Sequence, residues 1–218
     1  MINFSTLQNS WLSLLYGALV SLKIAILAVT IGIIGGTFLA LILLYGNRAV
    51  RVLAQGYVVV VRGTPMLVQM VTLYYVLPSF GITLSAFWSA VAAIGLNSIA
   101  YISQVVITGI QSIGKGQSEA AKTLGFSRWQ TIRLIILPQA FRAVLPALGN
   151  ECITLIKDSS LASVIGVAEL THQGAIVMSR TYDALTVYVG ITMIYLMMTS
   201  LATFMLYLLE RKLQHVKN

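Results

Sequence analysis

Long apolar runs separated by short polar stretches are the main pattern along the chain. Five such runs can be read, at about 11–45, 52–77, 87–110, 135–167 and 184–209. A helix needs about 20 apolar residues to cross the hydrocarbon core of a bilayer. Each run is long enough, so we expect an all-α integral membrane protein with five transmembrane helices.

Polar residues interrupt two of these runs. The second holds Arg62-Gly-Thr-Pro65, where the proline ring removes a backbone hydrogen bond. The fourth holds Lys157-Asp-Ser-Ser160. Irregular backbone inside a bilayer must be buried in protein or line a wet cavity, so two broken helices indicate a binding site near the midplane. The alternatives are a packing kink at Pro65 and a shallow, interfacial position for 157–160.

Small residues in the first run predict a close helix contact. Gly32 and Gly36 are four positions apart and therefore share one helix face. Without side chains on that face, another transmembrane helix can approach closely.

Composition supports the membrane assignment. The chain has 218 residues, of which 58% are hydrophobic and 9% are charged, whereas a soluble domain carries about 25% charged residues. The net charge of +8 is interpreted as loop charge that sets topology, so we expect no nucleic acid partner. A single cysteine, Cys152, excludes an internal disulfide. We expect one domain covering residues 1–218.

Basic residues predict the orientation. They gather between runs one and two, between runs three and four, and after run five, which alternating spans place on one side. The remaining loops, including the one with Glu169, His172, Arg180 and Asp183, carry no basic excess. The positive-inside rule therefore places the N-terminus outside and the C-terminus in the cytoplasm.

Ionisable residues inside a membrane are candidate functional groups. Glu151 and Asp158 are seven apart and share a face if the helix continues. They would be separated by roughly 10 Å along the axis, which suits an elongated amino acid. As a hypothesis, Glu151 faces a cationic side chain and Asp158 pairs with the α-amino group.

Further polar groups complete this hypothetical substrate site. Lys157, or free amides near Ser159 and Ser160 at a half-helix start, would hold the α-carboxylate. Thr64 is a further candidate, and Asn97 and Gln104 would add hydrogen bonds in the cavity or form helix–helix contacts instead. The competing interpretation is that Lys157 and Asp158 pair with each other, or with Arg62, to hold the fold.

A short polar helix is expected between runs three and four, over about 117–125. Glu119 falls in its first turn, where the helix dipole favours an anion. Gly125 suits a left-handed C-cap, and Ser127 can cap the helix that follows. Ala120 and Ala121 would let a partner surface press close. The alternative is an amphipathic helix that rests on lipid headgroups.

The order of residues in this region resembles a known signature. Glu119-Ala-Ala, then Gly125, then nine residues, Ile135, one residue, and Leu137-Pro138 is similar to the cytoplasmic signature of ABC importer permeases. Most of the chain resembles the polar amino acid branch of that family, which includes histidine, arginine and glutamine permeases. The other matching stretches are 62–65, 115–116, 137–140, 146–150 and 157–161.

This resemblance implies a multi-pass permease of the bacterial inner membrane with the type I importer fold and five membrane helices. It implies a second permease subunit, identical or paralogous, and an extracytoplasmic amino-acid-binding protein, which we expect at 78–83 and 168–183. Two ATPase subunits would dock on a coupling helix. The docking residues are Glu119, Ala120, Ala121, Thr123, Leu124 and Gly125.

One stretch near the coupling helix is close to a nucleotide-binding motif. Gly109 to Gly116 nearly matches the phosphate-binding loop, but the last position lacks the hydroxyl that binds Mg²⁺, and no strand precedes it. We therefore expect ATP and Mg²⁺ on the partner subunit, with no cofactor, metal site or catalytic activity in this chain.

The expected substrate is a polar, basic L-amino acid. The resemblance implies that relatives for basic amino acids carry an acid at the position of Glu151, and that relatives for glutamine can carry an amide. The alternatives are a permease for glutamine or cystine, a secondary transporter driven by an ion gradient, and a membrane scaffold without a transport path. Which amino acid is carried, and whether the second permease subunit is identical, stay open.

Overall fold

The computed structural model describes residues 4–214, and every regular element in that range is a helix. The four longest elements are α1 (Phe4–Tyr45), α4 (Ala86–Gln111), α7 (Leu137–Asp158) and α9 (Ala184–Gln214). The second run forms α2 (Arg48–Gly63), α3 (Met66–Val71), η1 (Thr72–Val76) and η2 (Leu77–Phe80). The other elements are α5 (Lys115–Thr123), α6 (Arg128–Gln130), η3 (Thr131–Ile136), η4 (Ser159–Ile165) and α8 (Leu170–Thr181).

By length and hydropathy, up to five segments among the described residues are candidate membrane spans. Four are continuous, at Gln8–Tyr45, Ala86–Gln111, Arg128–Ile165 and Ala184–Lys212. The fifth is a helix pair, Arg48–Gly63 and Met66–Phe80, bent by 105° at its break. The all-α membrane architecture expected from the sequence is confirmed, with four continuous candidate spans and a second run that forms a sharply bent helix pair.

The close approach predicted at Gly32 and Gly36 is confirmed in the packing of α1 against α4. A Cβ atom added to Gly36 would lie 2.8 Å from Cβ of Ile102, and one added to Gly32 would meet the hydroxyl of Ser98. The main core lies beside this contact, where Ile24 of α1 and Ile94 of α4 are fully buried. The two helices therefore form the fixed centre of the molecule.

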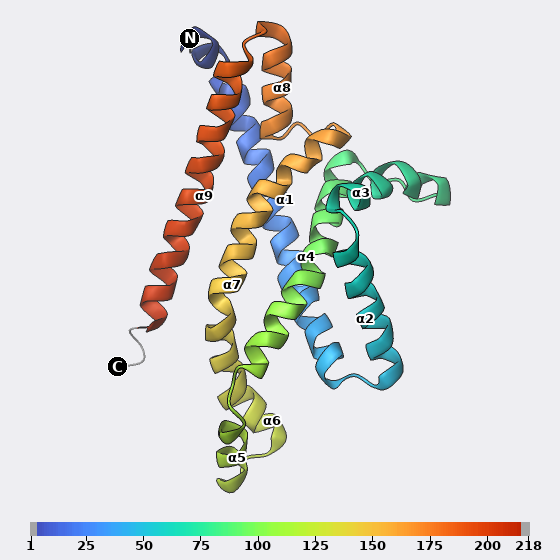
Figure 1. Ribbon diagram of the computed structural model, residues 1–218, viewed down its shortest axis with the longest axis vertical. Helices are drawn as coiled ribbons and strands as arrows, with labels where there is room; N and C mark the ends of the chain where they lie inside the picture. Colours follow the sequence, from blue (N-terminus) through green and yellow to red (C-terminus); the bar gives the residue numbers. More distant parts are fainter. Residues whose placement is uncertain (1–3, 215–218) are drawn as a thin grey trace.

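The molecule has two distinct ends along its long axis (Figure 1). The first turns of α1 and the whole of α8 lie at one end, and α5 with α6 lie at the other. The connection from α1 to α2 and the C-terminal end of α9 lie in the same half as α5. The three basic regions of the sequence thus share one half of the molecule, as alternating spans require.

The region expected as a polar external loop is a helix with a buried acid at its start. Glu169, the N-cap of α8, is fully buried. Its carboxylate accepts hydrogen bonds from the Ser21 hydroxyl (3.1 Å), the Thr171 amide (3.0 Å), the His172 amide (2.8 Å) and the Tyr195 hydroxyl (2.9 Å). Burial raises the pKa of Glu169, and these hydrogen bonds oppose the shift. The carboxylate therefore joins α1, α8 and α9.

Glu169→Gln is expected to lower the thermal stability of the protein. The glutamine NH₂ would face donors, which leaves a buried group unsatisfied at a cost of about 1–3 kcal/mol. For a chain of this size that corresponds to a fall in Tm of roughly 3–10 °C, measured by thermal unfolding in detergent. Asp183→Asn is the matched control, because Asp183 accepts from the Thr186 amide (3.1 Å) and the side-chain oxygen of Asn can still accept that bond.

The same variant has an expected pH signature. Because the pKa of Glu169 is raised in the fold, folding favours its protonated form, and stability falls as the pH rises from the ordinary glutamate value through the raised one. Glu169→Gln should lack that part of the pH dependence. An unchanged Tm, with an unchanged pH slope, would contradict a structural role for this carboxylate.

Candidate functional site

The break between α2 and α3 is centred on Thr64 and Pro65. Thr64 has φ −120° and ψ 144°, the extended conformation that a following proline imposes. Pro65 has φ −63° and ψ 134°, also extended. Two consecutive extended residues redirect the chain, which accounts for the 105° bend. The predicted interruption at this position is therefore confirmed as a complete break.

A glutamine that the sequence did not single out satisfies the backbone freed by this break. The Gln69 side-chain amide donates to the carbonyl oxygens of Val61 (2.8 Å) and Thr64 (3.1 Å) and to the Thr64 hydroxyl (2.8 Å). Its carbonyl oxygen accepts from the Asn97 amide at 3.3 Å. Carbonyl groups without partners are costly inside a membrane. Gln69 thus holds the break in shape and ties it to α4.

The predicted break at 157–160 is not a helix start, so the free amides expected there at a half-helix start are not found. At Ser159 the α-helix α7 tightens into the 3-10 helix η4 without interruption. The Ser159 amide donates to the carbonyl oxygens of Leu155 and Lys157, and its buried hydroxyl donates to Ile156 at 2.7 Å. Because these groups are already bonded, Ser159 offers no free amide to a carboxylate.

Polar residues from three regions meet in a cavity of about 510 Å³ at the α2–α3 break. The break and its flanks supply one wall, and the middle of α4 and the last turns of α7 supply the others. The lining residues are Arg62, Gly63, Thr64, Pro65, Met66, Asn97, Tyr101, Glu151, Thr154 and Asp158. We call this the break cavity.

Charge in the break cavity is arranged around one cation and two acids. The Arg62 guanidinium lies 5.0 Å from the centre of the Tyr101 ring, a cation–π contact. The Glu151 carboxylate accepts from the Ser98 hydroxyl at 3.5 Å. Within residues 4–214, Arg62 forms no ion pair with a carboxylate, so the pairing with Arg62 in the competing interpretation is not found. The cavity thus presents both signs of charge, as an amino acid zwitterion requires.

The structure brings together four of the seven residues proposed from the sequence, Thr64, Asn97, Glu151 and Asp158. Lys157, Ser159 and Ser160 do not line the cavity; Lys157 is exposed and Ser159 is buried. Tyr101 and Thr154 were missed. Both lie one helical turn from a proposed residue, Asn97 and Asp158 respectively, so the spacing of four positions was the available signal.

Gln69→Leu is expected to disturb the break cavity without unfolding the protein. Leucine keeps the size of the side chain but leaves the Val61 and Thr64 carbonyls unsatisfied, which costs about 1–3 kcal/mol. We expect a fall of several degrees in Tm and a loss of substrate affinity, measured by thermal unfolding with and without substrate. In Gln104→Leu, on the same face of α4 as Asn97 but outside the break cavity, affinity should be retained. Equal affinity in both variants would contradict the role of Gln69.

The predicted coupling helix corresponds to α5, with shifted bounds. It begins at Lys115, so Glu119 is beyond the first turn and its expected stabilisation by the helix dipole is wrong. Glu119, Ala120 and Thr123 are exposed, and Leu124 keeps 74% of its surface. Ala121 is only 1% exposed, so it packs inward and cannot meet a partner as expected. Figure 1 shows α5 at the extreme end of the molecule.

The end of α5 follows the prediction. Gly125 has φ +80°, the left-handed conformation that favours glycine. The Phe126 amide donates to Ala121 at 3.0 Å, and the Gly125 amide donates to Lys122 at 3.0 Å. Ser127 caps α6 with a reciprocal pair of bonds to Gln130. These caps present a short helix with an exposed Leu124 at its tip.

Comparison with known proteins supports this architecture. Residues 7–215 match the family model described as "Binding-protein-dependent transport system inner membrane component". The chain is 39% identical over 203 residues to the glutamine transport system permease protein GlnP of Escherichia coli, covering 92% of this chain and 93% of that protein. It is 37% identical over 202 residues to the arginine transport system permease protein ArtQ of Bacillus subtilis, covering 92% of each.

A solved structure shares the whole fold. The crystal structure of an amino acid ABC transporter with histidines includes a chain that superposes with a TM-score of 0.92. The two are 39% identical, and the match covers 97% of this chain and 99% of the other. The chain is therefore a multi-pass permease of the bacterial inner membrane with the type I ABC importer fold, and it belongs to the family of inner membrane components of binding-protein-dependent transport systems.

Proposed function

We propose that the chain is the permease subunit of an ATP-driven importer for polar, basic L-amino acids. The observation that carries this proposal is the break cavity, where Glu151 and Asp158 face the same space as Arg62. Two acids and one cation complement a cationic amino acid, which carries two positive groups and one carboxylate. Relatives named for arginine and glutamine support an amino acid substrate.

Each end of the substrate has a partner in this cavity. Glu151 binds the cationic side chain, and Asp158 binds the α-amino group. Arg62 replaces Lys157 as the residue that holds the α-carboxylate, because it lines the cavity and Lys157 does not. Asn97, held by Gln69, and the Thr64 hydroxyl add neutral hydrogen bonds.

Energy for transport comes from outside the chain in this proposal. Two ATPase subunits dock on the exposed face of α5, and their closure on ATP moves the permease between its two conformations. A second permease subunit and an extracytoplasmic binding protein complete the transporter. The coupling half of the molecule, with α5 and the C-terminal end of α9, faces the cytoplasm, as the basic loops indicate.

Reconstitution tests the proposal. Proteoliposomes that contain the permease, the ATPase subunits and the binding protein should accumulate arginine, lysine, histidine or ornithine only when ATP is supplied. Uptake by the permease alone, driven by a proton or sodium gradient, would show a secondary transporter instead.

One observation favours a neutral amino acid, glutamine, as the substrate: the 39% identity to a permease named for glutamine. Competition between unlabelled glutamine and labelled arginine distinguishes a neutral from a basic substrate. If glutamine competes as well as lysine does, the assignment to basic substrates is wrong.

A further inference from the structure

A second polar cavity lies at the other end of the molecule, between α5 and the ends of three spans. Its volume is about 490 Å³. The lining residues are Tyr45, Ile110, Ile113, Lys115, Ser118, Lys122, Arg128, Thr131, Ile132 and Ile136. We call it the basic cavity. It shares no lining residue with the break cavity.

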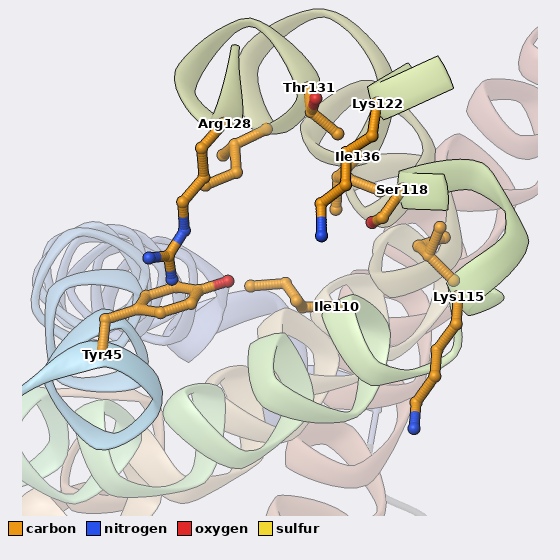
Figure 2. A pocket seen from close by; sticks show the side chains of 10 residues that line it. Tyr45, Ile110, Lys115, Ser118, Lys122, Arg128, Thr131 and Ile136 are labelled. Atoms are coloured by element: carbon orange, nitrogen blue, oxygen red, sulfur yellow. The ribbon is translucent and has the colours of Figure 1, made fainter. Parts of the chain in front are cut away.

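The charge of the basic cavity has one sign. Lys115 and Lys122 of α5 and Arg128 of α6 line it, and none of its lining residues within the described chain is acidic. Figure 2 shows the Lys122 ammonium directed into the opening and the Arg128 guanidinium at its edge near Tyr45, with Ser118 at the wall and the Lys115 ammonium pointing away from the opening. Like charges that line one cavity repel each other and attract an anion.

The other residues that line the basic cavity indicate where it lies relative to the candidate membrane spans. Tyr45 ends the candidate span Gln8–Tyr45, Ile110 lies one residue before the end of Ala86–Gln111, and Arg128 begins Arg128–Ile165. Tyrosine is enriched where the hydrocarbon core of a bilayer meets the headgroups. Ile113, Ile132 and Ile136 add apolar surface beside the cations. The basic cavity thus combines cations with an apolar wall at the ends of three candidate spans.

We propose that the basic cavity binds the phosphate of an anionic phospholipid headgroup. Lys122 and Arg128 contact the phosphate oxygens, and the Ser118 hydroxyl is available as a donor. The isoleucine wall accommodates the start of an acyl chain. Basic pockets between transmembrane helices recognise headgroups in this way. Because α5 forms one wall, a bound lipid holds α5 against the rest of the permease.

Lipid titration of the purified, delipidated transporter tests the site. Native mass spectrometry counts phosphatidylglycerol bound per permease subunit, with phosphatidylcholine of the same chain length as the comparison. Each basic residue near an anionic surface contributes about 1 kcal/mol, or roughly fivefold in affinity. The double variant Lys122→Gln with Arg128→Gln should therefore bind phosphatidylglycerol about 25-fold more weakly.

Two matched controls distinguish a specific lipid site from a general effect of lost positive charge. Arg133→Gln with Arg142→Gln removes the same charge nearby but outside the lining, and should bind lipid as the wild type does. Lys122→Arg with Arg128→Lys keeps the charge and should also retain the lipid. Equal loss in the Arg133 and Arg142 control, or equal binding of phosphatidylcholine, would overturn the proposal.

Two other occupants would also overturn it, and each has its own result. If inorganic phosphate alone protects the transporter against heat in lipid-free detergent, and does so through Lys122 and Arg128, the site is for a free anion. If the double variant loses the ATPase subunits while its lipid binding is unchanged, the basic cavity belongs to a protein interface.

Discussion

Glu151→Gln is expected to reverse the preference of the transporter for cationic over neutral amino acids. Glu151 lines the break cavity with only the Ser98 hydroxyl as a hydrogen-bond partner in the described chain, at 3.5 Å, so its charge is available to a substrate. Leaving a buried substrate cation without its acid costs about 2–5 kcal/mol. Uptake efficiency for arginine should therefore fall at least about 30-fold relative to glutamine.

The measurement is kcat/KM for arginine and for glutamine in proteoliposomes with ATP and binding protein. Asp158→Asn is the informative comparison, because the α-amino group is common to both substrates and uptake of both should fall together. Glu210→Gln removes an acid of α9 outside the break cavity and should change neither. If Glu151→Gln leaves the preference for cationic substrates unchanged, Glu151 is not the specificity residue.

Gly125→Asp is expected to uncouple transport from ATP hydrolysis. Gly125 has φ +80°, where a residue with a side chain is strained, and it follows the exposed Leu124 at the tip of α5. The left-handed conformation costs roughly 1–2 kcal/mol in most L-residues, and the new charge faces the proposed ATPase surface. We expect uptake to fall about tenfold or more, while the amount of permease in the membrane is unchanged.

Two further variants separate charge from strain. Gly125→Asn places a neutral side chain of the same size at the position, and should retain more uptake than Gly125→Asp because asparagine tolerates φ > 0. Glu119→Lys reverses an exposed charge without altering the cap, and should also weaken coupling. Full uptake in both Gly125→Asp and Glu119→Lys would show that α5 does not receive the force.

Breaks and caps could be predicted from the sequence where the chemistry of a single residue type sets the backbone, and not elsewhere. The break at Pro65 and the left-handed turn at Gly125 follow from one residue type each, a ring that restricts its neighbour and a residue without Cβ. The predicted break at Ser159 was wrong because polar side chains alone do not interrupt a helix. A tighter helix continues there, in which the Ser159 and Ser163 hydroxyls donate to carbonyl oxygens of the preceding turn.

The sequence by itself determined the membrane class, the close contact at Gly36, the break at Pro65 and the cap at Gly125. Run length, proline and the left-handed glycine act through residues close in the chain, and the small face at Gly36 permits close packing whichever helix meets it. Only the tertiary structure decided that Gln69 satisfies the break, that Ala121 faces inward and that Glu169 is buried.

The tertiary structure also brought together the residues that line the two cavities. Arg62 stacks on Tyr101 and lines one cavity with Asp158, and Tyr45 and Arg128 line the other, from positions tens of residues apart. Such meetings depend on the rotation of one helix against another, which is set by packing across the whole bundle. The spacing of residues within a single helix fixes which of them share a face, but not which other helix that face meets.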